Sequence, residues 1–375
     1  MGRGERRRRC AIPGALAAAL AAALLAGCSV GPAERHAASL RSGTESEGPG
    51  EESPGEETDD PRVPEDPAES SPPPPSSAPP PTAAPEEGTA EVTDTVDIGS
   101  EAECCLAALG DGAFLTGVRD TGAISLVDAE GGITELGFLP SVAAGDGWQM
   151  LGLAAQPGLA DGDWIYAYVR GPSTGRILRF PYDASGGESP QLSPSQLAPV
   201  FPAPAGDGVG VLAFGPDGML YVGTGEGEGE LAGAVLRMEP DGDMPEGQDS
   251  YVYSSGYTDP RGLAWDGDRM WAVDGGEGTR LYSVVPGAEP ALRWESEEET
   301  AAGLAEDRGV LWVPVGGDGT AALLRFPLEG VELVREEPQR LLDGGELGAP
   351  QGAAAVGAGE LWVPTDDGVL RVEVE

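Results

Sequence analysis

Residues 212–225 read LAFGPDGMLYVGTG, and residues 233–239 follow as GAVLRME. Short apolar runs separated by Gly, Asp and Pro are typical of paired β-strands. The pattern recurs along the chain as an aromatic-containing strand followed by a strand with an apolar core and often an arginine. The aromatic strands are AFL at 113–115, WIY at 164–166, MLYV at 219–222, RMWA at 269–272, VLWV at 310–313 and ELWV at 360–363. Repeats of roughly 40 to 60 residues are typical of propeller blades, so the sequence predicts an all-β, six-bladed propeller.

The two ends of the repeat region predict how the ring closes. The last copy ends at Glu375 after only three evident strands. Residues 91–98, EVTDTVDI, alternate polar and apolar side chains, as a half-buried edge strand does. We expect this segment to supply the missing fourth strand of the last blade, which would leave no exposed sheet edge there.

The N-terminus carries an export signal. Five arginines within the first nine residues precede an Ala/Leu-rich run that is too short to span a bilayer comfortably. The run ends in Leu25-Ala26-Gly27-Cys28, which resembles the lipobox of bacterial lipoproteins. The resemblance implies that residues 1–27 are a signal peptide, and that Cys28 receives a diacylglycerol and anchors the protein to the outer face of the cell membrane. The alternative is an ordinary signal peptide with a chance cysteine.

We expect residues 28–91 to form a linker and residues 92–375 to form the propeller. The linker contains runs such as SSPPPPSSAPPP and has few apolar residues, so we expect it to be disordered. The formal net charge of −42 excludes nucleic acid as a partner, because phosphates would be repelled. The chain has no lysine and no asparagine, which indicates a bacterium with a GC-rich genome. We expect a monomer whose ligand is a carbohydrate or an envelope protein.

Cysteine and histidine usage restricts the chemistry. Cys104 and Cys105 are the two cysteines beyond the lipobox, and they are adjacent. Outside the cytoplasm they either form a vicinal disulfide or remain two thiols on opposite faces of a strand. The chain's single histidine, His36, precedes the propeller, which excludes a Ser/His/Asp triad there.

Three segments resemble the glucose/sorbosone dehydrogenase family. MLGLAAQPGLADGDWIYAYV (150–169) is similar to its GLLGLAxHPxF…VYVxY motif, residues 212–225 to LxFGPDGxLYxxxGD, and PRGLAWDGDRMW (260–271) to RNPQGLAxxxxGxLW. The resemblance covers roughly residues 97 to 375. It implies a propeller whose central pocket holds pyrroloquinoline quinone (PQQ) and calcium, and in which sugars are oxidised by hydride transfer to the quinone.

Positions that carry the family's chemistry differ here. The histidine base that precedes the LxFGPDG strand is replaced by Asp207, a candidate substitute base. The family's arginine before the Asn-Pro step corresponds to Thr258 here, and its later Arg-x-Arg pair corresponds to residues 349–351, which include no arginine. The family's EHG segment, part of its metal-binding region, reads DGG at 274–276. Because basic residues are lost at each place, the sequence favours a ligand-binding or protein-binding member that has lost catalysis. The alternative is a PQQ-dependent sugar dehydrogenase with a substituted site.

The remaining candidate site residues follow from the same alignment. Gln149, Asp259, Arg261 and Asp274 are candidates for cofactor contacts, and solvated loop positions are the competing interpretation. The acidic loop GEGEGE at 225–230 is either a calcium site or a flexible turn. The recurring aromatic residues of the second strands are interpreted as packing between blades.

Overall fold

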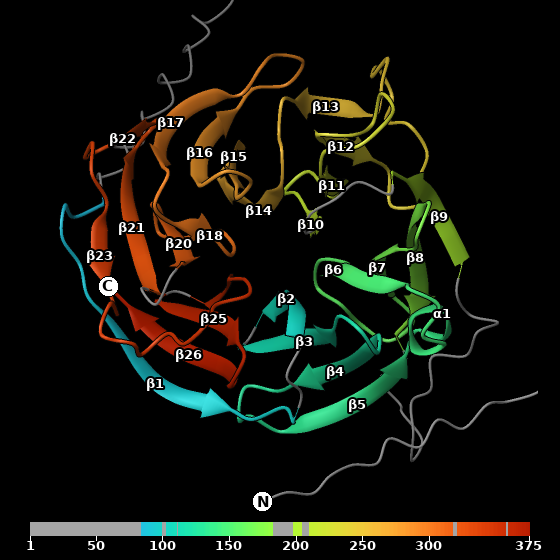
Figure 1. The fold of residues 1–375 in the computed structure, drawn as a ribbon, viewed down its shortest axis with the longest axis horizontal. Coiled ribbons are helices and arrows are strands. Elements are labelled where there is room, and N and C mark those ends of the chain that lie inside the picture. The colour runs from blue at the N-terminus through green and yellow to red at the C-terminus, as the bar shows by residue number, and fades with distance from the viewer. Residues whose placement is uncertain are drawn as a thin grey trace, which may run out of the picture. The chain divides into compact units, whose positions relative to one another are not determined.

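The computed structural model describes residues 84–99, 103–110, 112–182, 198–204, 210–317, 321–357 and 359–375. Their strands form six antiparallel sheets that follow one another around a central axis (Figure 1). The predicted all-β, six-bladed propeller is therefore confirmed. Over these residues, no helix has the length and hydrophobicity needed to cross a membrane. The predicted signal peptide and most of the predicted linker lie outside the described residues.

Each blade is a sheet whose first strand lies nearest the axis. Blade I consists of β2 (Glu103–Gly110), β3 (Ala113–Val118), β4 (Ala123–Val127) and β5 (Ile133–Phe138), followed by the short helix α1 (Pro140–Ala143). Blade II consists of β6 (Gln149–Ala155), β7 (Trp164–Arg170), β8 (Gly175–Pro181) and β9 (Ala198–Ala203). Blade III consists of β10 (Val211–Phe214), β11 (Leu220–Thr224), β12 (Ala234–Met238) and β13 (Val252–Ser255).

The second half of the ring repeats this arrangement. Blade IV consists of β14 (Pro260–Asp266), β15 (Arg269–Asp274), β16 (Thr279–Val284) and β17 (Ala291–Ser296). Blade V consists of β18 (Thr300–Ala301), β19 (Ala305–Asp307), β20 (Val310–Gly316), β21 (Ala322–Glu329), β22 (Glu332–Leu333) and β23 (Gln339–Leu341). Blade VI consists of β24 (Ala354–Gly357), β25 (Glu360–Thr365), β26 (Gly368–Val374) and β1 (Ala90–Val96).

The sequence repeat has a structural explanation in cross-strand pairs. In four blades an arginine of the third strand lies directly opposite the aromatic residue of the second strand, since side chains opposite one another in a ladder are close neighbours. Two of these guanidinium groups lie over the indole ring, at 5.7 Å in blade V and 5.6 Å in blade VI. The four pairs are Tyr166–Arg179, Tyr221–Arg237, Trp312–Arg325 and Trp362–Arg371.

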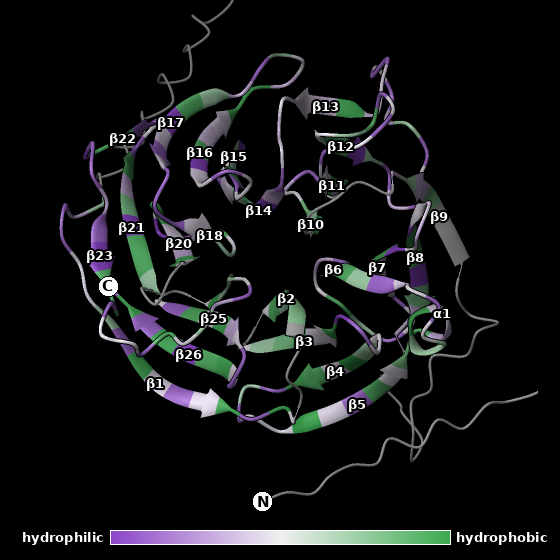
Figure 2. Cartoon of the chain, in the orientation of Figure 1, coloured by the Kyte–Doolittle hydropathy of each residue, from purple (hydrophilic) through white to green (hydrophobic). Residues whose placement is uncertain are grey.

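Aromatic residues of the second strands also pack the blades against one another. Trp271, Trp312 and Trp362 are buried in three separate apolar clusters. Trp362 of blade VI lies 4.7 Å, between ring centroids, from Phe114 of blade I. Figure 2 shows the corresponding apolar stretches along the strands and hydrophilic residues in the connecting loops. These tryptophans are packing residues, as the sequence predicted.

The ring closes through the N-terminal strand. β1 pairs antiparallel with β26, from Ala90 opposite Val374 to Val96 opposite Val369, so the predicted closure is confirmed. The segment before β1 is also attached, because the Gln339 side chain donates to the Gly88 carbonyl at 2.8 Å and accepts from the Gly88 amide at 2.9 Å. The first and last strands of the propeller are therefore held in one blade.

Candidate functional site

A cavity of about 530 Å³ lies on the propeller axis. It is lined by the innermost strands of all six blades, and most of its lining residues are Ala, Gly, Leu or Val. Arg261 and Glu306 are the charged residues among the described residues that line it. Ligand pockets commonly measure 300 to 1,000 Å³ and combine an apolar wall with a few polar groups, so this cavity has the size of a small-molecule site.

Glycines on the innermost strands allow the strands of neighbouring blades to lie close together around the cavity. A Cβ atom at Gly262 of β14 would lie 2.4 Å from the backbone nitrogen of Leu304, in the neighbouring blade. A Cβ at Gly152 of β6 would lie 3.2 Å from the backbone nitrogen of Leu212 in β10. A side chain at position 262 would collide with the next blade, and one at position 152 would press against its neighbour, so these glycines allow the inner strands to approach closely.

Arg119 lies close enough to Arg170 and Arg261, which come from other blades, for their charges to interact, and of the three Arg261 lines the cavity. Arg119 follows β3 in blade I, Arg170 ends β7 in blade II, and Arg261 lies near the start of β14 in blade IV. The backbone amide of Met150 donates to the Arg119 carbonyl at 2.9 Å, which ties the end of β3 to the start of β6. Arg170 donates from Nη2 to Oε1 of Gln149 at 3.1 Å. We call Arg119, Arg170 and Arg261 the arginine cluster.

The positive charge of the Arg119 guanidinium is only weakly balanced by negative groups. Burial is the main cause that lowers the pKa of its guanidinium, and the positive charges of Arg170 and Arg261 lower the pKa further. The nearby carboxylates of Asp120 and Asp259 act in the opposite direction. Among the described residues, no hydrogen bond or ion pair reaches the Arg119 side chain. A desolvated cation beside two like charges is costly, and a bound anion would relieve that cost.

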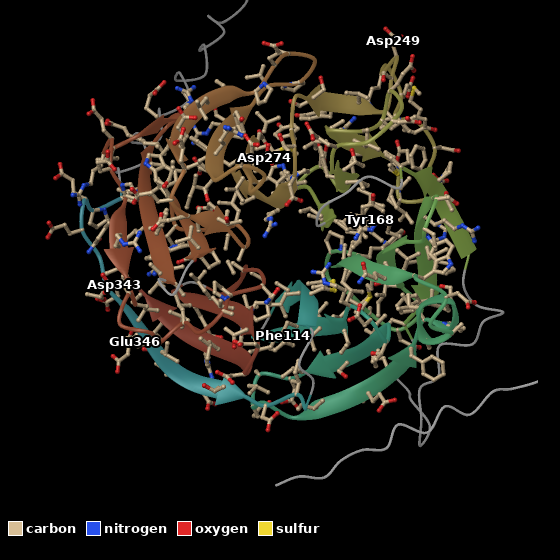
Figure 3. The ribbon with its side chains drawn as sticks, viewed as in Figure 1. Phe114, Tyr168, Asp249, Asp274, Asp343 and Glu346 are labelled. Atoms are coloured by element: carbon tan, nitrogen blue, oxygen red, sulfur yellow. A yellow bond between two sulfur atoms is a disulfide. The ribbon has the colours of Figure 1, made fainter. Side chains whose placement is uncertain are left out.

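The carboxylates of the aspartates near the arginine cluster already accept hydrogen bonds from the protein. Asp274 accepts from the Thr258 amide at 2.8 Å and from the Asp259 amide at 2.5 Å. Asp259 is paired with Arg261 at 2.7 Å. These contacts fix the turn that presents Arg261 to the cavity. Figure 3 shows Asp274 in blade IV and Tyr168 in blade II on different sides of the centre of the ring, with nitrogen-bearing side chains around it.

Asp120 belongs to the same network on the opposite side of the axis. It accepts from Nε2 of Gln149 at 2.9 Å, so a continuous hydrogen-bonded path runs from Asp120 through Gln149 to Arg170. Gln149 thus orients one member of the arginine cluster. The carboxylates of Asp120, Asp259 and Asp274 therefore already accept hydrogen bonds from protein groups, whereas the guanidinium N–H groups of Arg119 can donate to a ligand.

Glu306 lies at the other end of the cavity. It is on β19 opposite Leu311, close to the turn at which Gly309 donates to its Oε1 at 2.7 Å. Burial is the main cause that raises the pKa of this carboxyl group, and the charges of Asp266 and Asp307 raise it further. Its position separates it from the arginine cluster, because Arg261 and Asp266 are at opposite ends of β14.

The structure thus brings Asp259, Arg261 and Asp274 together at the start of β14, where Arg261 lines the cavity, and it places Gln149 in contact with Asp120 and Arg170. Asp207 and Cys28 lie outside the described residues. Within the described ranges, no group of three or more His, Cys, Asp or Glu side chains is arranged to hold a metal ion, and the described loop at 225–230 belongs to no such group.

The sequence analysis missed Arg119 and Arg170. Neither is in a segment that resembles a family motif at an arginine position. For Arg170 the sequence held one signal. Arg170 ends the second strand of blade II, and it lies opposite Gln149, a candidate residue, at the start of the first strand. No comparable signal marks Arg119, which reaches the cluster only because blades I and II are adjacent in the ring.

Comparisons with known proteins agree with this architecture. The family model for glucose/sorbosone dehydrogenase matches residues 101–280. The PQQ-bound aldose sugar dehydrogenase from Streptomyces coelicolor is 32% identical, with a TM-score of 0.70, and the match covers 78% of this chain and 100% of that one. This chain belongs to the glucose/sorbosone dehydrogenase family.

Two further solved structures are similar to this chain in fold. A putative oxidoreductase (glucose dehydrogenase) from Thermus thermophilus is 26% identical over 77% of this chain and 100% of its own, with a TM-score of 0.61. A gluconolactonase from Xanthomonas campestris is 14% identical over 78% of this chain and 99% of its own, with a TM-score of 0.51, and shares the fold alone. No curated protein sequence matches this chain.

Proposed function

We propose that this protein is a lipid-anchored, extracytoplasmic member of the family whose propeller binds a planar polycarboxylate in its central cavity and does not oxidise sugars. The observation that carries the binding half is the arginine cluster, with the desolvated Arg119 guanidinium in it. A carboxylate-bearing ligand would accept hydrogen bonds from the Arg119 guanidinium, whose side chain makes no hydrogen bond or ion pair within the described residues. Charge-assisted hydrogen bonds to arginine are among the strongest polar contacts in proteins.

The family's cofactor fits this donor set. PQQ is a planar tricarboxylate, and it supplies the two-electron oxidant in active members. The arginines are suited to its carboxylates, and the apolar wall of small residues is suited to the faces of its ring system. Arg119 and Arg170 would compensate for the family arginines that are absent at Thr258 and at 349–351.

Proton abstraction is the step for which the described site offers no suitable group. A general base must lie within hydrogen-bond reach of the hydroxyl it deprotonates. Near the arginine cluster, Asp120, Asp259 and Asp274 already accept hydrogen bonds from the protein. Glu306 lies at the far end of the cavity, and the only histidine of the sequence precedes the propeller. We infer that the ligand is held without being used to oxidise a sugar.

The second candidate function is a PQQ-dependent aldose dehydrogenase in which Asp207 replaces the histidine base. It is favoured by the 32% identity to the S. coelicolor enzyme. Calorimetric titration with PQQ and calcium, followed by a dye-reduction assay over a panel of aldoses, separates the two candidates. Binding without turnover supports the binding protein, and turnover supports the dehydrogenase.

The proposed anchor makes a prediction of its own. Replacing Cys28 with serine removes the thiol to which the diacylglycerol would be attached, so Cys28→Ser should shift the protein from the membrane fraction to the soluble fraction or leave it as uncleaved precursor. Detergent phase partitioning and immunoblotting measure the shift.

Cys10→Ser is the matched control, because Cys10 belongs to the segment that cleavage would remove. It should leave partitioning unchanged. A Cys28→Ser protein that is correctly cleaved and still partitions with membranes would contradict the lipid anchor.

A further inference from the structure

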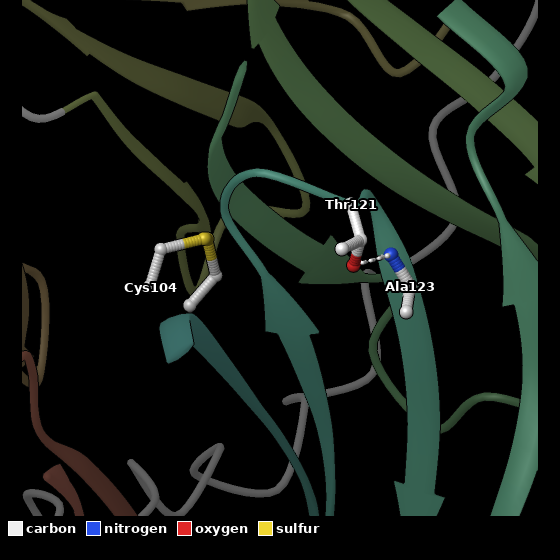
Figure 4. Close-up of a disulfide and its surroundings, with 4 residues drawn as sticks. Cys104, Thr121 and Ala123 are labelled. Atoms are coloured by element: carbon white, nitrogen blue, oxygen red, sulfur yellow. Dashed lines mark hydrogen bonds between the residues drawn. A yellow bond between two sulfur atoms is a disulfide. The ribbon is translucent and has the colours of Figure 1, made fainter. Parts of the chain in front are cut away.

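A disulfide between adjacent residues lies in the wall of the central cavity. Cys104 and Cys105, near the start of β2, are joined by an S–S bond (Figure 4). Both residues are among those that line the cavity. Cys105 lies opposite Gly117 in the ladder, and Arg119 follows β3 directly beyond that point. The disulfide is therefore at the same end of the cavity as the arginine cluster.

This disulfide adds little to global stability. A disulfide stabilises mainly by closing a loop in the unfolded chain, and the stabilisation grows with loop length. A bond between neighbouring residues closes the smallest loop that a chain can form. The β2 segment is held independently by its ladder with β3, so the fold does not depend on this bond. Its position in the cavity wall instead indicates a local role.

We propose that the Cys104–Cys105 disulfide is a redox-controlled part of the ligand site, and that the cavity binds a planar polycarboxylate tightly only when the two cysteines are oxidised. This inference rests on the proposed function. In the oxidised state the two sulfur atoms form a compact, polarisable, uncharged surface against which an aromatic ring can pack. The arginine cluster, at the same end of the inner strands, would bind the carboxylates of the same ligand.

Reduction occurs by exchange with a small thiol that enters the cavity. A thiolate attacks one cysteine sulfur, the S–S bond breaks, and its electron pair leaves on the other sulfur, which takes up a proton. A second thiol molecule then attacks the mixed disulfide. The protein gains two electrons and two protons and becomes a dithiol, while two small thiols are oxidised to one disulfide.

The reduced state binds an anion less well for two physical reasons. Separated sulfur atoms need van der Waals spacing, so the dithiol occupies more of the cavity than the bonded pair. Neighbouring arginines also favour the thiolate form of cysteine, and a thiolate competes with the ligand for the same guanidinium groups. Both effects act on ligand affinity and leave the blade intact.

The test uses benzene-1,3,5-tricarboxylate as the probe, because it is planar and anionic and does not react with thiols. Its affinity is measured by calorimetry on the purified protein when oxidised, after reduction by dithiothreitol and anaerobic desalting, and after reoxidation. We expect reduction to weaken binding about tenfold, comparable to the loss of one charge-assisted hydrogen bond, and reoxidation to restore it. Mass spectrometry of the peptide that contains Cys104 and Cys105 reports the redox state.

A double variant, Cys104→Ala with Cys105→Ala, provides the matched control. It forms neither a disulfide nor a thiolate at this position, so its affinity for the probe should not respond to dithiothreitol. Thermal unfolding of wild type should be nearly the same in both redox states. Equal affinity of oxidised and reduced wild type, or an equal response of the double variant, overturns the redox inference alone. Absence of probe binding in every state contradicts the proposed function and this inference with it.

Discussion

Deleting residues 29–99 should lower the melting temperature by about 10 °C or more, whereas deleting residues 29–83 should leave it nearly unchanged. The first deletion removes β1, which pairs with β26 along its length and buries Val96. Each lost ladder hydrogen bond contributes about 1 kcal/mol, and for a protein of this size each kcal/mol corresponds to roughly 2 to 4 °C. The exposed edge of β26 would also favour aggregation.

The two deletions are matched because both keep the predicted signal peptide and Cys28 and both remove most of the predicted linker. The shorter deletion retains Gly88 and its hydrogen bonds to Gln339. Calorimetry or circular dichroism of the purified variants gives the melting temperatures. Equal values would contradict closure of blade VI by the N-terminal strand.

Arg119→Gln should weaken binding of PQQ or benzene-1,3,5-tricarboxylate about tenfold while leaving the melting temperature of the free protein unchanged or raised. The substitution removes one charge-assisted contact to the ligand. It also removes a desolvated charge and its repulsion from Arg170 and Arg261, which the free protein has to tolerate. A residue with a merely structural role would show the opposite pattern, with lower stability and little change in affinity.

Arg269→Gln is the control for this variant. Arg269 is on the same propeller and pairs with Asp266 at the far end of β14 from Arg261. Its removal should change ligand affinity by less than about twofold, since exposed ion pairs contribute little. Calorimetric titration of both variants measures the difference. Equal losses of affinity would show that the arginine cluster is not part of the binding site.

Much of the fold was predictable because its signals are local and repeated. The period of the aromatic strands indicated the number of blades, and the alternation in residues 91–98 indicated the closing strand. The arginines of the third strands were visible in sequence, but their pairing with the second-strand aromatics depends on register, for instance Trp312 opposite Arg325. Turn geometry is equally hard to predict: Arg308 and Gly309, both with positive φ, form the turn between β19 and β20, and an arginine at the first of these positions gives only a weak turn signal.

The candidate site was predictable only in part. Asp259, Arg261 and Asp274 belong to segments that resemble family motifs, and they do lie together. Arg119 directly follows β3 of blade I, so its proximity to Arg261 of blade IV follows from the arrangement of the blades around the axis and not from any local pattern. The sequence-based argument that basic residues had been lost compared aligned positions only, and it therefore did not consider Arg119 and Arg170.

The measurement that tests the central claim most directly is titration of the purified protein with PQQ in the presence of calcium, followed by dye reduction with a panel of aldoses. We predict saturable binding in the micromolar range and no turnover above the rate of free quinone, because the arginine cluster supplies anion contacts and the described site offers no base. Turnover with any aldose that is abolished by Asp207→Ala would contradict this account and make Asp207 the base of an active dehydrogenase. Absence of PQQ binding would also contradict this account, because it would exclude a ligand site at the arginine cluster.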